Sequence, residues 1–236
     1  MLLYIVRHGE PIYSPVESLT PLGKRQAEAV GRRLCLHGID EIYTSPLTRA
    51  KETAQPLCEM LHKEAKVEEW ASENFACEYF SYFDEEKGKN VWAIYGPSAG
   101  MKNVEAINND DWFDVPPFNK TKAREGWAIL KEKSDAFTAK LGYEREGLIY
   151  KIKEPSNKKI AMFCHHGFGT TWLSYLLGIP PFLFWTTFDI THTGVVILEF
   201  RNNKDGYTAP KCLSFDDVSH IYAENLPFVN SGGIKL

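Results

Sequence analysis

Two segments far apart in the chain each place basic side chains directly after an apolar run and before a glycine. The first, "LLYIVRHG", ends on Arg7 and His8, and the second, "IAMFCHHG", ends on His165 and His166. Adjacent side chains that are or can become cationic favour an anionic ligand. Because a neutral imidazole is also a nucleophile and a proton carrier, these residues could react with that ligand as well as bind it.

A second arginine, Arg49, lies in the segment "SPLTRAKETA", which follows a short apolar stretch and begins a predicted helix. Guanidinium groups bind phosphate oxygens in pairs and keep their proton, so Arg7 and Arg49 suit the charge on a phosphoryl group. They also disfavour protonation of His8, because a further cation beside them is costly. A neutral His8 could attack phosphorus through one ring nitrogen while the other holds its proton against a backbone acceptor. Hydrolysis would then proceed as two displacements.

The elements that must position these residues alternate between strands and helices. Apolar runs predict strands at residues 2–6, 39–45, 66–70, 158–164, 193–200 and 209–215. Apolar residues at helical spacing predict helices at about 20–38, 45–61, 120–141 and 169–177. This alternation predicts an α/β fold, a three-layer sandwich whose mostly parallel sheet is covered by helices on both faces. Ligands bind beyond the carboxyl ends of such strands, so neighbouring strands that end near His8 and His166 would bring both histidines to one place.

Local signals mark the ends of the first two helices. Thr20 is a typical N-cap for the first helix, and Gly38 suits its end. Ser45 takes the N-cap position before the second helix. Pro56 interrupts the apolar spacing of that helix, so we expect the helix to kink or to end early.

Residues 74–118 are expected to form an irregular insertion with short helices. Phe75, Tyr79 and Phe83 have helical spacing, whereas the stretch from residue 88 to 117 mixes glycine, asparagine, aspartate, tryptophan and proline. We predict that this insertion caps the active site as a subregion of one α/β domain spanning residues 1–236. Aromatic residues in such a segment usually belong to the core, and in a cap they could select the substrate.

The overall composition is that of a globular protein. The chain has 236 residues, of which 44% are hydrophobic and 25% charged, and its net charge is −4. This charge disfavours nucleic acid and anionic membrane surfaces as partners. Five cysteines without a CxxC pair are typical of a reduced compartment and disfavour a zinc knuckle. The N-terminal apolar run is too short for a signal peptide and no run could span a bilayer, so we expect a cytoplasmic protein.

Four motifs occur in the order "RHGEP", "TPLGKRQA", "SPLTRAKETA" and "HHG" along nearly the whole chain. Together they resemble the histidine phosphatase superfamily, the phosphoglycerate mutase-like group. The resemblance implies that His8 is the nucleophile that accepts the phosphoryl group and that Arg7 and Arg49 grip the phosphate. It assigns His166, the histidine directly before the glycine, as the second histidine, which contacts the phosphate and stabilises its charge. His165 occupies a position that is often serine in relatives, so we regard it as a neighbour of the site.

A carboxyl group is needed to protonate the leaving oxygen and then to activate water. Relatives supply a glutamate shortly after the third strand, usually in a segment with a downstream Gly-x-Trp-Glu-Gly pattern. This chain lacks that pattern. The position after "KVEEW" favours Glu73, and Glu69 and Glu78 stay open as alternatives.

The resemblance predicts a metal-independent phosphomonoesterase that hydrolyses a small phosphorylated metabolite and needs no cofactor. A phosphoglycerate-mutase-type phosphotransferase with the same phosphohistidine is the alternative, although "PIYSPVES" departs from the Ser-x-Trp-Asn continuation common in mutases. A metallohydrolase built on His8, His166 and Glu73 is disfavoured, because two guanidinium groups would repel the cation. A phosphate-binding module without activity is a fourth hypothesis. His192 begins a strand and could line the pocket, but a structural role is favoured, and the oligomeric state is left open.

Overall fold

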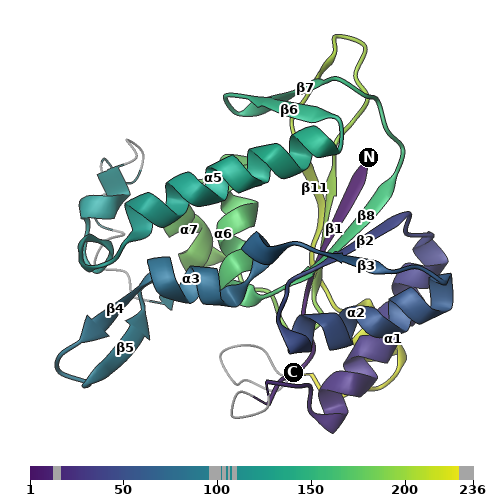
Figure 1. The fold of residues 1–236 in the computed structure, drawn as a ribbon, viewed down its shortest axis with the longest axis horizontal. Coiled ribbons are helices and arrows are strands. Elements are labelled where there is room, and N and C mark those ends of the chain that lie inside the picture. Colours follow the sequence, from purple (N-terminus) through teal and green to yellow (C-terminus); the bar gives the residue numbers. More distant parts are fainter. Residues whose placement is uncertain (13–16, 96–101, 103–104, 106, 108–110, 229–236) are drawn as a thin grey trace.

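A six-stranded sheet crosses the middle of the computed structural model, which describes residues 1–12, 17–95, 102, 105, 107 and 111–228 (Figure 1). Its strands are β1 (Leu2–Arg7), β2 (Glu41–Thr44), β3 (Ala65–Val67), β8 (Lys159–Cys164), β9 (Val195–Glu199) and β11 (Lys211–Asp217). They lie in the order β11-β9-β1-β8-β2-β3. The four strands from β1 to β3 in this order are parallel, whereas β9 runs antiparallel to both of its neighbours. The sheet is mostly parallel, as predicted.

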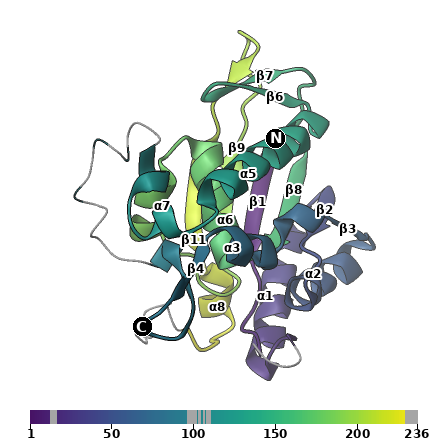
Figure 2. The ribbon, with the colours of Figure 1, turned by 60° about the vertical axis from the view of Figure 1, so that its left-hand side comes forward.

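Helices cover both faces of this sheet and confirm the predicted three layers (Figure 2). One layer contains α1 (Pro21–His37) and α2 (Thr48–Leu61), with α8 (Ser219–Ala223) against α1; the other contains α3 (Glu73–Tyr79), α5 (Ala123–Lys140), α6 (His166–Leu177) and α7 (Pro181–Thr187). Successive side chains of β1 explain the arrangement, because they point to opposite faces. Tyr4 and Val6 pack with residues of α1 and α2, and Leu3 and Ile5 pack with residues of α5 and α6. No helix of the described residues is long and apolar enough to cross a membrane.

The sequence pattern does not predict the smaller β-structures. These are the hairpin of β4 (Ser81–Asp84) and β5 (Lys89–Trp92), and a sheet of β6 (Tyr143–Glu146), β7 (Ile149–Ile152) and β10 (Tyr207–Thr208). The β4–β5 hairpin projects from the end of α3 (Figure 1). Phe83 lies on β4, so the helical spacing from Phe75 ends at Tyr79. Within the predicted insertion, residues 96–101, 103–104, 106 and 108–110 lie outside the described residues.

The second helix differs from the prediction at its start and at its proline. Its N-cap is Leu47 rather than Ser45. The Ser45 hydroxyl lies 3.2 Å from the Leu47 amide nitrogen and 2.7 Å from Nε2 of His165, so it joins the loop to another strand end. The helix also continues past Pro56 to its full length. Pro56 packs closely against Gly31 of α1, and this tertiary contact favours the helix beyond the proline.

Candidate active site

The carboxyl ends of β1 and β8 lie side by side in the sheet. The two strands are paired in register up to Arg7 and Cys164, and β2 flanks β8 on its other side. The next residue on each strand is a histidine, and the ring centroids of His8 and His165 are 5.1 Å apart. The predicted meeting of the two histidine segments at one sheet edge therefore occurs.

His8 is held as a neutral imidazole. Its Nδ1 lies 2.7 Å from the carbonyl oxygen of Gly9, so Nδ1–H donates to the backbone and Nε2 keeps its lone pair. The side chain is only 3% exposed. Burial lowers the pKa of His8 well below its usual range, and the nearby His165 and Arg7 lower it further. The unprotonated Nε2 is suited to attack an electrophile such as phosphorus.

The guanidinium group of Arg7 donates hydrogen bonds to two neutral acceptors. Nη1 donates to the carbonyl oxygen of Ile190 at 2.6 Å, and Nη2 donates to Nε2 of His192 at 3.1 Å. The His192 ring also lies 5.8 Å from that of His8. Burial, together with the positive charge of Arg7, lowers the pKa of His192 to about 3. His192 therefore lies beside His8 and Arg7, a residue for which the sequence favoured a structural role over one in lining the pocket.

Arg49 enters the same cluster from the first turn of α2. Its side chain is buried, with Nη1 3.5 Å from Oε2 of Glu17. Thr53 joins this turn to the loop after β1, because its hydroxyl donates to the Arg49 carbonyl at 2.6 Å and accepts from the Gly9 amide at 3.0 Å. The charge of Arg49 lowers the pKa of both His165 and His8, although burial is the larger cause in each case.

The two adjacent histidines have different surroundings. His165 is the N-cap of α6, and His166 is the first residue of that helix, which begins three residues earlier than predicted. Nε2 of His165 lies 2.7 Å from the Ser45 hydroxyl oxygen, which also accepts from the Leu47 amide. Nε2 of His166 lies 2.7 Å from Oδ1 of Asp189, a side chain that is 43% exposed. The structure therefore brings the ring of His165 against that of His8, and it places Nε2 of His166 against Asp189.

Glu73 contacts the start of the helix that follows the histidines. It is the first residue of α3, and its carboxylate accepts from the backbone amides of Gly167 at 3.0 Å and Phe168 at 2.9 Å. A carboxylate is stabilised at a helix N-terminus by the free amides and the helix dipole. The alternatives Glu69 and Glu78 are exposed to solvent. Among the described residues, no three histidine, cysteine or acidic side chains form a potential metal site.

Two glycines of the motifs allow close packing around the cluster. A Cβ on Gly9 would lie 2.6 Å from the carbonyl oxygen of Gly23, so the loop after β1 approaches the start of α1 at backbone distance. A Cβ on Gly167 would overlap the indole ring of Trp92. Because glycine stands at this position, the β4–β5 hairpin reaches the N-terminus of α6 and the edge of the histidine cluster.

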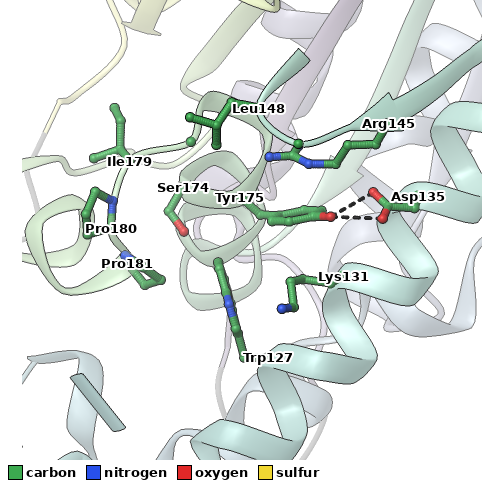
Figure 3. Close-up of a pocket in the computed structure, with 12 residues that line it drawn as sticks. Trp127, Lys131, Asp135, Arg145, Leu148, Ser174, Tyr175, Ile179, Pro180 and Pro181 are labelled. Carbon is green, nitrogen blue, oxygen red and sulfur yellow. Dashed lines mark hydrogen bonds between the residues drawn. The ribbon is translucent and has the colours of Figure 1, made fainter. Parts of the chain in front are cut away.

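A hollow of about 750 Å³ lies apart from this cluster (Figure 3). It is bounded by α5, the C-terminal half of α6 and the β6–β7 turn, and it shares no residue with the histidine cluster. Tyr175 crosses it, with its hydroxyl donating to Asp135 at 2.9 Å and its ring 3.9 Å beneath the guanidinium carbon of Arg145. Asp135 and Arg145, two of the charged groups in this hollow, thus both contact the same tyrosine.

Sequence comparisons relate the N-terminal part of the chain to known phosphatases. Residues 3–86 match the histidine phosphatase superfamily (branch 1). Over 100 residues the chain is 33% identical to "Putative phosphoserine phosphatase 2" of Hydrogenobacter thermophilus, an alignment that covers 39% of this chain and 46% of that protein. The chain thus spans about half the length of this curated relative.

Solved structures share the fold over nearly the whole chain. Phosphoserine phosphatase from Entamoeba histolytica, in complex with 3-phosphoglyceric acid, has a TM-score of 0.61 at 23% identity. The alignment covers 93% of this chain and 98% of the phosphatase chain. The mycobacterial glucosyl-3-phosphoglycerate phosphatase has a TM-score of 0.59 at 16% identity, with 91% and 98% covered. The family match includes the segments that carry Arg7, His8 and Arg49. Residues 3–86 are thus similar to the histidine phosphatase superfamily (branch 1), and nearly the whole chain shares the fold of these solved structures.

Proposed function

We propose that this chain is a metal-independent phosphomonoesterase that hydrolyses a small phosphorylated metabolite through a phosphohistidine on His8. One observation carries the proposal: Nε of Arg7, Nε of Arg49 and Nδ1 of His165 are buried and have no hydrogen-bond partner among the described residues. After burial itself, the electrostatic influence of these three side chains lowers the pKa of His8. Buried donors without partners cost free energy, so such a group is expected where an anion binds.

In the first step, Nε2 of His8 attacks phosphorus and the bond from phosphorus to the ester oxygen breaks. Arg7 and Arg49 stabilise the negative charge on the equatorial oxygens, usually the largest contribution to catalysis of this kind. The proposal requires Glu73 to enter this step in its acid form, although its two amide contacts favour the carboxylate; the acid gives its proton to the leaving oxygen, so the alcohol departs as a neutral molecule. The products of this step are the alcohol and a phosphohistidine.

In the second step, a water molecule attacks the phosphohistidine and the bond from phosphorus to Nε2 of His8 breaks. The carboxylate left on Glu73 accepts the proton of that water. Inorganic phosphate leaves, and both side chains return to their starting protonation states. The cycle consumes water and the phosphoester alone, so the proposal includes no cofactor or metal.

His165 takes the part that the family resemblance assigned to His166. Its ring lies 5.1 Å from the His8 ring, and its buried Nδ1 has no hydrogen-bond partner among the described residues. In the tautomer in which the Ser45 hydroxyl donates to Nε2, Nδ1 carries the hydrogen and can donate it to a phosphoryl oxygen. Nε2 of His166, in contrast, is paired with the Asp189 carboxylate. In this proposal His166 contributes to the rim of the pocket rather than to the phosphate contacts.

Residues 74–118 are proposed to cap this pocket within a single domain of residues 1–236. The support comes from Trp92 on β5, whose indole lies against Gly167 at the start of α6. That position is next to the phosphate donors but not among them. The indole would therefore contact the alcohol part of the substrate and influence which esters are accepted.

A panel of small phosphomonoesters tests the proposed function. Phosphoserine and 3-phosphoglycerate belong in it, because they are bound by the relative from Entamoeba histolytica. We expect release of inorganic phosphate from at least one ester, with an unchanged rate in the presence of a chelator. Interconversion of 3- and 2-phosphoglycerate without phosphate release would favour the mutase instead. Tight binding of phosphate without turnover of any ester would favour a binding module.

The Glu73→Gln variant tests the proposed acid. We expect kcat/KM for an alkyl phosphomonoester to fall by about 10²- to 10⁴-fold, because an alkoxide needs a proton to leave. For 4-nitrophenyl phosphate, whose leaving group needs little protonation, we expect a loss below about tenfold. Glutamine keeps a carbonyl oxygen for the Gly167 amide, so the contact with α6 can persist. The exposed Glu78→Gln serves as the matched control. Equal losses on both substrates would contradict the acid role.

A further inference from the structure

The loop that carries His192 is tied to the end of β1. Between α7 and β9, the amide of Thr193 donates to the carbonyl oxygens of Arg7 at 3.1 Å and His8 at 3.3 Å. Asp216 holds the other side of the loop, because its Oδ1 accepts from the amide of Thr191 at 2.8 Å and from its hydroxyl at 2.9 Å. These contacts hold the loop against the end of β1 and so fix the position of His192 relative to Arg7.

The acceptors that this loop offers to Arg7 are both uncharged. They are the Ile190 carbonyl and Nε2 of His192, and within the described part of the chain no carboxylate forms an ion pair with Arg7. Arg49 differs, because Glu17 lies 3.5 Å from its Nη1. A carboxylate placed against Arg7 would orient the guanidinium equally well but would also neutralise it. A carbonyl and an imidazole orient the guanidinium and leave its positive charge available to a ligand.

We propose that His192 is a positioning residue that orients Arg7 with a neutral acceptor, so that the full charge and the buried Nε–H of Arg7 serve the phosphoryl group. This inference rests on the proposed phosphomonoesterase function, since it concerns the arginine that would bind the phosphate. His192 acts through Arg7 and needs no contact of its own with the substrate. Its burial beside this cation keeps the imidazole neutral, which preserves Nε2 as an acceptor.

Three replacements of His192 separate position from charge. His192→Gln puts an amide oxygen near the place of Nε2 and stays neutral, His192→Glu puts a carboxylate there, and His192→Leu removes the acceptor. His220→Leu is the matched control, because His220 is also a buried histidine, bonded to Thr193 at 2.9 Å, and is not a partner of Arg7. Binding of orthophosphate by calorimetry gives a readout that does not require turnover, and kcat/KM on the best ester is measured alongside.

We expect orthophosphate to bind about tenfold or more weakly to His192→Leu, because a hydrogen bond to a charged group is lost. His192→Gln and the His220→Leu control are expected to stay within about threefold of the unmodified protein. His192→Glu is expected to bind at least about tenfold more weakly than His192→Gln, because it places a negative charge beside Arg7. A negative charge near the site weakens anion binding even without positioning of Arg7, so the leucine and glutamine variants test the positioning and the glutamine and glutamate variants test the argument about charge.

The outcomes distinguish this inference from the function on which it rests. If the unmodified protein binds orthophosphate but His192→Leu binds it equally well, His192 does not position Arg7 and the proposed function stands. Equal binding by the folded glutamine and glutamate variants would overturn the argument about charge. If the unmodified protein neither binds orthophosphate nor hydrolyses any ester, the proposed function falls and this inference falls with it. Should the leucine variant fail to fold, the comparison of glutamine with glutamate still decides the argument about charge.

Discussion

The His8→Ala variant is expected to lose roughly four to six orders of magnitude in phosphomonoesterase activity, as when a covalent nucleophile is removed. The replacement removes Nε2, which the hydrogen bond from Nδ1–H to Gly9, at 2.7 Å, leaves unprotonated. Arg7 and Arg49 remain, so phosphate binding should persist while the two-step route is lost. Initial rates of phosphate release at saturating substrate measure the effect.

Trapping the intermediate provides a second measurement for the same residue. Brief reaction with a ³²P-labelled ester should give the unmodified protein a label that is labile in acid and stable in alkali, as expected of a phosphohistidine, and should leave His8→Ala unlabelled. The exposed His62, at the end of α2, offers a control, and His62→Ala should be labelled normally. An acid-stable label, or a His8→Ala rate within about tenfold of the unmodified protein, would rule out the proposed nucleophile.

The second large effect is expected at His165. The His165→Ala variant removes one preorganised donor from the phosphoryl group, and we expect kcat/KM to fall by about 10²- to 10³-fold. His166→Ala is expected to change kcat/KM by less than about fivefold, because its Nε2 is paired with Asp189 outside the group of buried donors. The two variants differ by one position in the chain, so each is a strict control for the other. Steady-state kinetics on the best ester from the panel provide the comparison.

A conservative replacement distinguishes loss of the donor from loss of packing at this position. His165→Asn keeps an N–H near the position of Nδ1, so it should recover part of the activity that His165→Ala loses. A large loss in His166→Ala together with a small loss in His165→Ala would reverse the assignment. That result would restore the role that the family resemblance gave to the histidine next to Gly167.

The sequence alone was sufficient to predict the layers of the fold and the place of Arg7 and His8 at the edge of the sheet. Apolar runs and helical spacing predict the main strands and helices, because burial on one or both faces imposes a period on each element separately. Thr20 indeed caps the first helix and Gly38 follows its end in a left-handed conformation. Arg7 and His8 directly follow a buried strand, so their location at the sheet edge can be inferred from sequence.

The choice between the adjacent histidines depended on tertiary structure. The sequence suggests that the strand before them ends near a glycine, but not at which residue. The register with β1 pairs Cys164 with Arg7, so His165 directly follows the last paired residue of β8, and its ring lies against that of His8. Register is set by packing between strands more than 100 residues apart, and a shift of one residue turns each side chain to the other face. For predicting which histidine lies beside His8, adjacency to a glycine is therefore weaker evidence than being the first residue after the strand.

The same reason explains why the sequence left the role of His192 open between lining the pocket and a structural role. It precedes a strand, and its place depends on the direction of that strand in the sheet. β9 is antiparallel to β1, so its first residues lie beside the end of β1, and the loop before it reaches Arg7. Local residue patterns report burial within one element and carry no information on the direction of its neighbour.

Glu73 follows the same rule, because the contact of α3 with the start of α6 depends on how two helices pack. The sequence determined which residues could do the chemistry and which elements carry them, and the tertiary structure decided which of them meet.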